Sequence, residues 1–352
     1  MSYTPIQIRS RNQSMECFKI LASILVVFLH VPFPGKIGLS VTLLAGDFVV
    51  PVFFAISGYF NYGADVKTLA RRLKHLLKLY ALVILLTLLY GLISTELVGG
   101  SSVVFLKQFL PDLQELGVWL FFHKDPRNAQ LWYLTVLCLF YLVLRIYTQF
   151  FGEKPVDYRP LYLTAVGFSI VSLLLICIPH ITGAELPYIL VNNAYTALPM
   201  FTLGIFLHQY QDAIRENFRP TAKKLIILWI LGQLLVRLSH HAGLGNLPFG
   251  NQLKTIALML LLVYYPTVTS GSGLIAGWIG KFGAWSTYIY VLHILVLRAY
   301  QTFLQPALHI ALGHCEPFLA PIFVAGISFV IAVLFERAEH LVKLMQNKRR
   351  KR

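Results

Sequence analysis

The fold is decided by an apolar stretch near the start of the chain, Cys17–Val31, which reads CFKILASILVVFLHV. Lys19 and His30 lie eleven residues apart in this stretch. Because an α-helix turns about 100° per residue, both side chains lie on one face, roughly 16 Å apart along the axis. A charge and an imidazole in a helix of membrane-spanning length are costly unless they face protein or water. We therefore interpret both residues as functional.

The composition is that of a membrane protein. The 352 residues are 57% hydrophobic and only 13% charged, and the mean hydropathy is +0.67. A soluble domain carries about twice this charged fraction. The apolar residues form blocks of spanning length. The sequence predicts an all-α, polytopic membrane protein with about ten transmembrane helices, at roughly 16–33, 43–62, 76–98, 131–151, 161–181, 189–207, 224–239, 252–269, 285–304 and 318–336.

Lysine and arginine set the expected orientation, because they concentrate in cytoplasmic segments. With the N-terminus inside, the cytoplasmic segments hold twenty of these residues and the external ones four, namely Lys36, Lys107, Lys124 and Arg127. We expect both termini in the cytoplasm, one domain over residues 1–352, and a short basic tail at 337–352 against anionic headgroups. The same bias explains most of the net charge of +15, so we expect no nucleic-acid partner.

His30 is the predicted general base. It lies near the external end of the first span, and a neutral imidazole can take a proton from a hydroxyl. Asp47 falls at a similar depth in the second span, where a carboxylate could orient the imidazole. Two structural alternatives stay open: His30 reaches for the interface or bonds a carbonyl, and Asp47 caps a helix or pairs with another cation.

Lys19 lies at the cytoplasmic end of the first span, near a basic cluster. A helix over 69–80 places four cations, Arg71, Arg72, His75 and Lys78, at spacings of three and four on one face. Such a face suits a multiply phosphorylated ligand. Membrane topology alone also explains positive residues at this boundary.

Three outer cations, Arg237, Lys254 and Arg298, could meet an acidic or polar acceptor, or phospholipid headgroups. We interpret His293 as structural. Pro51 predicts a kink in the second span, and Ser57 and Gly58 permit close helix contact. The chain has no HExxH helix, and its four cysteines lack metal-ligand spacing, so we expect no metal site.

Four motifs resemble those of the acyltransferase 3 superfamily, integral-membrane acyltransferases that modify bacterial cell-surface glycans. ECFKILASILVVFLH (16–30) is similar to the family's first helix, in which a basic residue precedes a histidine by eleven positions. VPVFFAISGYF (50–60) resembles its FFxxSG-type second helix. LWYL (131–134) resembles the start of its fourth helix, and STYIYVLH (286–293) its late SYxxYxxH pattern. The motifs follow the family's order over nearly the whole chain.

The resemblance implies a membrane O-acyltransferase that moves an acyl group, usually acetyl, from acyl-CoA to a hydroxyl of a surface polysaccharide or lipid-linked sugar precursor. It implies an inner or plasma membrane location, an essential His30, and donor binding by an RxxR-type motif. Here that motif is Arg72-Leu73-Lys74-His75, with histidine in place of the second arginine. Some relatives have an acidic residue where this chain has Pro51 and Val52, and Asp47 is the nearest substitute.

We therefore predict that Lys19, Arg71, Arg72, His75 and Lys78 bind acetyl-CoA. His30 and Asp47 would be catalytic, and Trp132 and Arg298 would bind the acceptor. The runner-up is a transporter or flippase for a glycan or lipid-linked sugar, although inverted repeats and helices broken at matching places are not seen in the sequence. A third class, a structural partner in polysaccharide export, predicts tolerance of substitutions at Lys19 and His30.

Overall fold

The structure is a computed structural model that describes residues 13–46, 48–122, 127–152, 154–183, 193–244, 248–265 and 274–350. Within these ranges every regular element is a helix. Apolar segments take this form because lipid offers the backbone no hydrogen bonds. The elements are α1 (Gln13–His30), α2 (Gly35–Ala45), α3 (Val49–Asn61), α4 (Val66–Leu97), α5 (Ser102–Phe109), α6 (Leu113–Phe122), η1 (Ala129–Leu131), α7 (Trp132–Phe151), α8 (Arg159–Thr182), α9 (Asn193–Gln209), α10 (Gln211–Asn217), α11 (Ala222–His241), α12 (Pro248–Tyr264), α13 (Leu274–Ala299), η3 (Tyr300–Leu304), α14 (Gln305–Leu312), η4 (Gly313–Cys315) and α15 (Glu316–Arg350).

The described residues of the ten predicted segments lie mostly in helices, and several helices run past the predicted ends. In the described part of the chain, six helical stretches are long and apolar enough to cross a bilayer: Gln13–His30, Gly35–Asn61, Val66–Leu97, Trp132–Phe151, Arg159–Thr182 and Lys281–Gln346. The last stretch runs from α13 through α14 into α15. An all-helical membrane protein is confirmed, while the count of ten crossings and the cytoplasmic termini stay predictions.

The second span differs from the prediction in its shape. It is divided into α2 and α3, and the break lies between Ala45 and Val49 rather than at Pro51. Pro51 instead occupies the first turn of α3, where its missing N–H is not needed by the helix. The expected kink at Pro51 was therefore wrong by one turn.

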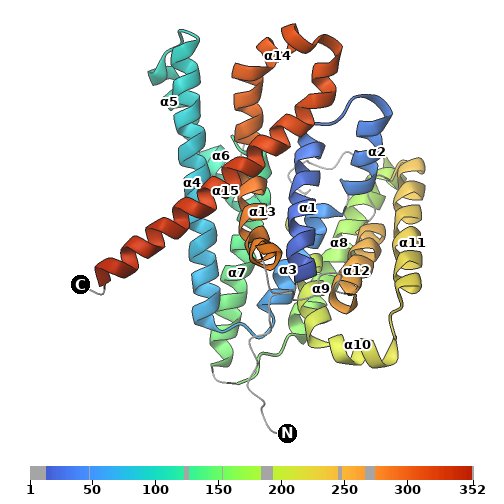
Figure 1. Cartoon of the computed structure of the whole chain (residues 1–352). Helices are drawn as coiled ribbons and strands as arrows, with labels where there is room; N and C mark the ends of the chain where they lie inside the picture. Colours follow the sequence, from blue (N-terminus) through green and yellow to red (C-terminus); the bar gives the residue numbers. More distant parts are fainter. Residues whose placement is uncertain are drawn as a thin grey trace.

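The helices form a bundle with two distinct ends. The short helices α5 and α14 lie at one end, and α10 and the α3–α4 connection lie at the other (Figure 1). The long helix α15 packs against α13, crosses the bundle obliquely and runs past α4 toward the C-terminus (Figure 1). We call these the α5 end and the α10 end.

Two glycines allow helices α3 and α9 to pack closely at the centre of the bundle. At Gly58 of α3, a Cβ atom would collide with the backbone carbonyl of Phe201 in α9. At Gly204 of α9, it would collide with the carbonyl of Ala55 in α3. Small residues let helix backbones approach this closely. The close contact predicted from Ser57 and Gly58 is thus confirmed, and it fixes α3 in the core.

Candidate active site

Two histidines meet where α1 ends. His30 is the last residue of α1, before Pro32 and Pro34, and its side chain is exposed. His293 of α13 is fully buried. The centroids of the two rings are 5.0 Å apart. The predicted base therefore lies beside a histidine that we interpreted from the sequence as structural.

The hydrogen bonds of His293 define its chemistry. Its Nδ1 lies 2.7 Å from the carbonyl oxygen of Tyr290, while Nε2 is buried without a hydrogen-bond partner among the described residues. Since a carbonyl only accepts, Nδ1 carries the proton and Nε2 is an acceptor. An unsatisfied buried acceptor costs about 1–3 kcal/mol. The His293 ring beside His30 therefore carries a buried acceptor that is not satisfied by the described residues.

A line of polar and aromatic side chains runs from His293 into the core. The Tyr290 ring lies 6.1 Å from His293 and 5.1 Å from the Tyr133 ring, between centroids. The Tyr290 hydroxyl donates to the carbonyl oxygen of Gln130 at 2.9 Å. The Tyr133 hydroxyl lies 3.3 Å from Ser57 Oγ. Helices α13, α7 and α3 each contribute a member, so their packing defines the line.

The line continues to the other end of α3. Asn61 Nδ2 donates to the carbonyl oxygen of Ser57 at 2.6 Å. Arg72 Nη1 donates to Asn61 Oδ1 at 2.7 Å and to the carbonyl oxygen of Phe60 at 2.8 Å. The Lys19 ammonium lies 5.3 Å from the centroid of the Phe60 ring. Lys19 and Arg72, two of the predicted donor-binding residues, thus meet at one residue of α3.

Lys19 also has a partner that the prediction missed. Its Nζ lies 3.0 Å from Oε1 of Glu16, one turn earlier in α1. The Glu16 side chain is only 8% exposed, and its Oε2 has no hydrogen-bond partner in the described part of the chain. The carboxylate fills the space where a Cβ on Gly283 of α13 would lie. The signal was present, because an acidic residue three positions before a lysine faces it on a helix.

The other predicted donor residues separate into two environments. Arg71 is exposed and donates to Thr68 Oγ1 at 3.0 Å. His75 and Lys78 line a cavity of about 250 Å³ between α4, α13 and α15, together with Lys343. The cations predicted on one helix face therefore lie in different places: Arg72 turns inward to α3, and His75 and Lys78 face α15.

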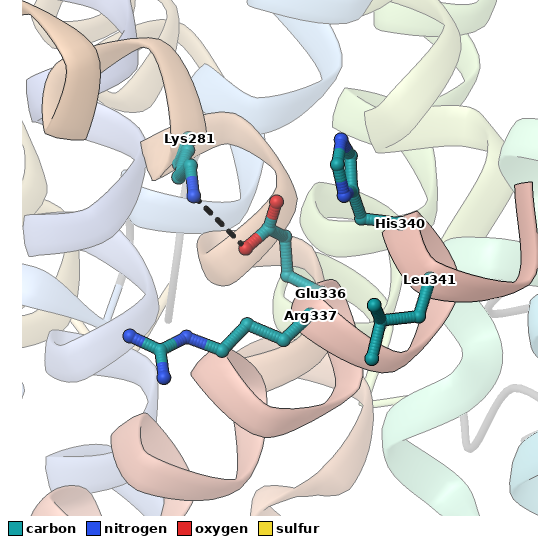
Figure 2. Close-up of a pocket in the computed structure, with 5 residues that line it drawn as sticks. All are labelled: Lys281, Glu336, Arg337, His340 and Leu341. Carbon is teal, nitrogen blue, oxygen red and sulfur yellow. Dashed lines mark ion pairs between the residues drawn. The ribbon is translucent and has the colours of Figure 1, made fainter. Parts of the chain in front are cut away.

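The cavity lined by His75, Lys78 and Lys343, which we call the α15 cavity, also contains a polar network. Glu339 accepts a hydrogen bond from the Tyr288 hydroxyl at 3.0 Å and pairs with Lys343 at 2.7 Å. A neighbouring cavity of about 240 Å³ is lined by Lys281, Glu336, Arg337, His340 and Leu341 (Figure 2). Its Lys281–Glu336 ion pair, 3.5 Å long, joins α13 to α15 (Figure 2). The end of α15 thus adds cations that the sequence did not assign to the site.

The remaining predicted residues lie elsewhere. Trp132 is half-buried at the start of α7, with its ring 5.8 Å from that of Phe54. Arg298 lines a cavity at the α5 end. Asp47 lies outside the described residues, so its proposed role stays a prediction. Across the ranges that the structure covers, no group of three or more His, Cys, Asp or Glu side chains could hold a metal.

The described helices thus connect the histidine pair to a basic cluster inside a membrane-embedded bundle. Residues 12–337 match the family model of acyltransferase 3, which is described as an acyltransferase domain. The chain belongs to the acyltransferase 3 family and is a membrane protein, and this membership implies acyltransferase activity. No curated protein and no solved structure matches the chain.

Proposed function

We propose that this membrane acyltransferase moves an acyl group, acetyl in the first instance, from acyl-CoA to a hydroxyl of a surface polysaccharide or a lipid-linked sugar precursor. It would act in the inner or plasma membrane. The observation that carries the proposal is the side-chain line from Lys19 and Arg72 to His30, because it joins a cationic end to a basic imidazole.

The α10 end is the proposed donor site. Coenzyme A carries phosphates at one end and a thioester at the other, and cations bind phosphate through charge-assisted hydrogen bonds. Lys19 and Arg72 at Phe60 would stand at the entrance to the bundle. Arg71, His75 and Lys78, with Lys343 across the α15 cavity, would hold the phosphates. The pantetheine arm would follow the side-chain line toward the α5 end, over a distance comparable with the roughly 16 Å from Lys19 to His30.

His30 would act as the general base at the α5 end. Its neutral ring nitrogen takes the proton from the acceptor hydroxyl while the hydroxyl oxygen attacks the thioester carbonyl. The carbon–sulfur bond then breaks, and CoA leaves as a thiolate that the proton neutralises. Holding donor and acceptor side by side supplies much of the remaining acceleration.

His293 would position His30. Its Nε2 is an acceptor, so the neighbouring His30 ring can direct its N–H inward and keep its basic nitrogen outward. This arrangement gives His293 the orienting role that the sequence suggested for Asp47. Support comes from the burial of His293 and the 5.0 Å ring separation.

The test uses the full chain reconstituted in vesicles with labelled acetyl-CoA and a polysaccharide or sugar acceptor. Label recovered on the acceptor hydroxyl, detected by mass spectrometry, is the expected result. Uptake of the sugar into vesicles without turnover of acetyl-CoA would overturn the proposal and indicate a transporter.

A further inference from the structure

A cavity at the α5 end combines polar, aromatic and cationic side chains. It measures about 310 Å³ and lies between α4, α5 and α13, with Ser94, Phe105, Gln108, Phe109, Arg127 and Arg298 among its lining residues. Helix α1, which ends in His30, finishes at the same end of the bundle as α5 (Figure 1). The cavity therefore lies on the side of the molecule where the proposed transfer takes place.

Arg298 is held firmly at this cavity. Its Nη2 donates to the carbonyl oxygen of Arg127 at 2.7 Å, which uses one of five N–H donors. Its own carbonyl accepts from the Tyr90 hydroxyl at 3.0 Å, and that hydroxyl lies 2.7 Å from Thr302 Oγ1. A π-helical turn, η3, follows at once. Such turns are frequent at functional sites because they redirect a helix locally.

The charge balance of the cavity favours an anion. Arg127 is already paired: its Nη2 lies 2.5 Å from Glu115 Oε2, and its Nε donates to the carbonyl oxygen of Phe109. None of the described residues that line the cavity is acidic. Arg298 therefore brings a positive charge that no lining carboxylate balances. A guanidinium of this kind binds carboxylate or phosphate through paired hydrogen bonds.

The remaining walls suit a sugar ring. Phe105 packs on Gly91 of α4, where a Cβ would collide with its ring, and the Phe105 and Phe109 rings are 5.6 Å apart. These aromatic surfaces offer apolar contact to the C–H face of a sugar. Gln108 and Ser94 add an amide and a hydroxyl for hydrogen bonds to sugar hydroxyls.

We propose that this cavity binds a sugar that carries an anionic group, a carboxylate or a phosphate, with Arg298 as the ligand of the anion. A uronic acid and a sugar phosphate share this chemistry. The inference rests on the proposed function only in taking this sugar to be the acyl acceptor. Binding itself needs no acyl-CoA.

The test measures binding to the purified full chain by titration calorimetry, with methyl glucuronide, glucose 1-phosphate and methyl glucoside as probes. We expect one or both anionic probes to bind at least about tenfold more tightly than the neutral glucoside, the size of a charge-assisted hydrogen bond. Preference for the glucuronide indicates a uronic acid, and preference for the phosphate indicates a phosphorylated sugar. Equal binding of all three probes would overturn the inference.

Two variants locate the anion. Arg298→Gln should remove the preference for anionic probes, and the control Arg215→Gln, at an exposed arginine of α10, should keep it. Gln108→Glu, at an exposed position of α5, places a repelling charge at the cavity and leaves the Arg298 bonds intact, so it serves if Arg298→Gln does not fold. A preference unchanged in both variants would refute the assignment. Anion binding without any acyl transfer would refute the proposed function and leave the cavity assignment standing.

Discussion

The ion pair between Lys19 and Glu16 gives the sharpest prediction, because the same lysine is assigned to the donor. Lys19→Met would leave both oxygens of the Glu16 carboxylate without a partner among the described residues. Breaking a buried pair from one side costs about 3–5 kcal/mol. The Lys19 side chain is still 20% exposed, so we expect the lower end of that range, about 3 kcal/mol.

A double variant separates the cost of the unpaired Glu16 charge from the cost of changing the shape of the Lys19 side chain. Glu16→Gln removes the stranded charge, so Glu16→Gln with Lys19→Met should regain most of the lost stability. Glu16→Gln alone should cost about 1 kcal/mol, because a lysine near a helix end can reach water. The free energy of unfolding is measured in mixed micelles by titration with a denaturing detergent, using tryptophan fluorescence.

Two results would refute this reasoning. One is a loss of stability well below 1 kcal/mol for Lys19→Met, and the other is a double variant as unstable as Lys19→Met. The double variant also tests the donor role, since it folds without Lys19. Its KM for acetyl-CoA should rise if Lys19 contacts the donor, and an unchanged KM would restrict Lys19 to its structural role.

Three further predictions address the positioning of the site. His293→Ala should lower the rate of acyl transfer about tenfold or more without changing the KM for acetyl-CoA, since His293 orients the base and does not contact the donor; a changed KM with unchanged rate in steady-state assays would contradict this. Gly58→Ala should strongly lower the melting temperature, because its Cβ meets the backbone of Phe201. The control Gly167→Ala in α8 meets nothing within 4 Å and should be neutral or slightly stabilising. Equal shifts in the melting temperatures of the two variants would contradict the close packing at Gly58. Asp65 caps α4 by accepting from the Thr68 N–H at 2.9 Å, so Asp65→Ala should cost about 1 kcal/mol and Asp65→Asn little. Hydrogen bonding by Thr68 holds the pKa of the Asp65 carboxyl below its usual value, so this contribution is present near neutral pH and is lost as the pH falls through that pKa; a cost of Asp65→Ala that is the same at neutral and acidic pH would contradict it.

Much of the fold follows from the sequence, because length and apolarity decide which segments become helices in lipid. The end of α1 at His30 follows from Pro32 and Pro34, which cannot continue a helix. The two short helices α5 and α6 coincide with two apolar patches in the connection after α4, VVFLKQFL (103–110) and LGVWLFF (116–122). The break between α2 and α3 was misplaced because Pro51 is tolerated in a first turn, so its presence alone does not locate a kink.

The sequence predicts which residues of the site share one face of a helix, but not which residues of different helices lie close together. Eleven residues give the axial separation of Lys19 and His30 and the face they share. This spacing does not show that His293, on a helix far along the chain, packs beside His30. The spacing of the cations in α4 likewise does not show that Arg72 turns toward Phe60 while Lys78 turns toward α15. These pairings depend on how α1, α3, α4 and α13 rotate when they pack. Gly58, for example, fixes how closely α3 approaches α9.

Whether His30 is the base of an acyl transfer can be tested with one pair of histidine variants. Purified His30→Ala and the control His314→Ala, at an exposed histidine of η4, are compared with the unmodified chain for transfer of acetyl from acetyl-CoA to a glycan. We expect His30→Ala to lower the rate of transfer about 100-fold or more while acetyl-CoA still binds, and His314→Ala to keep the rate unchanged. Undiminished transfer by a folded His30→Ala protein would rule out His30 as the base.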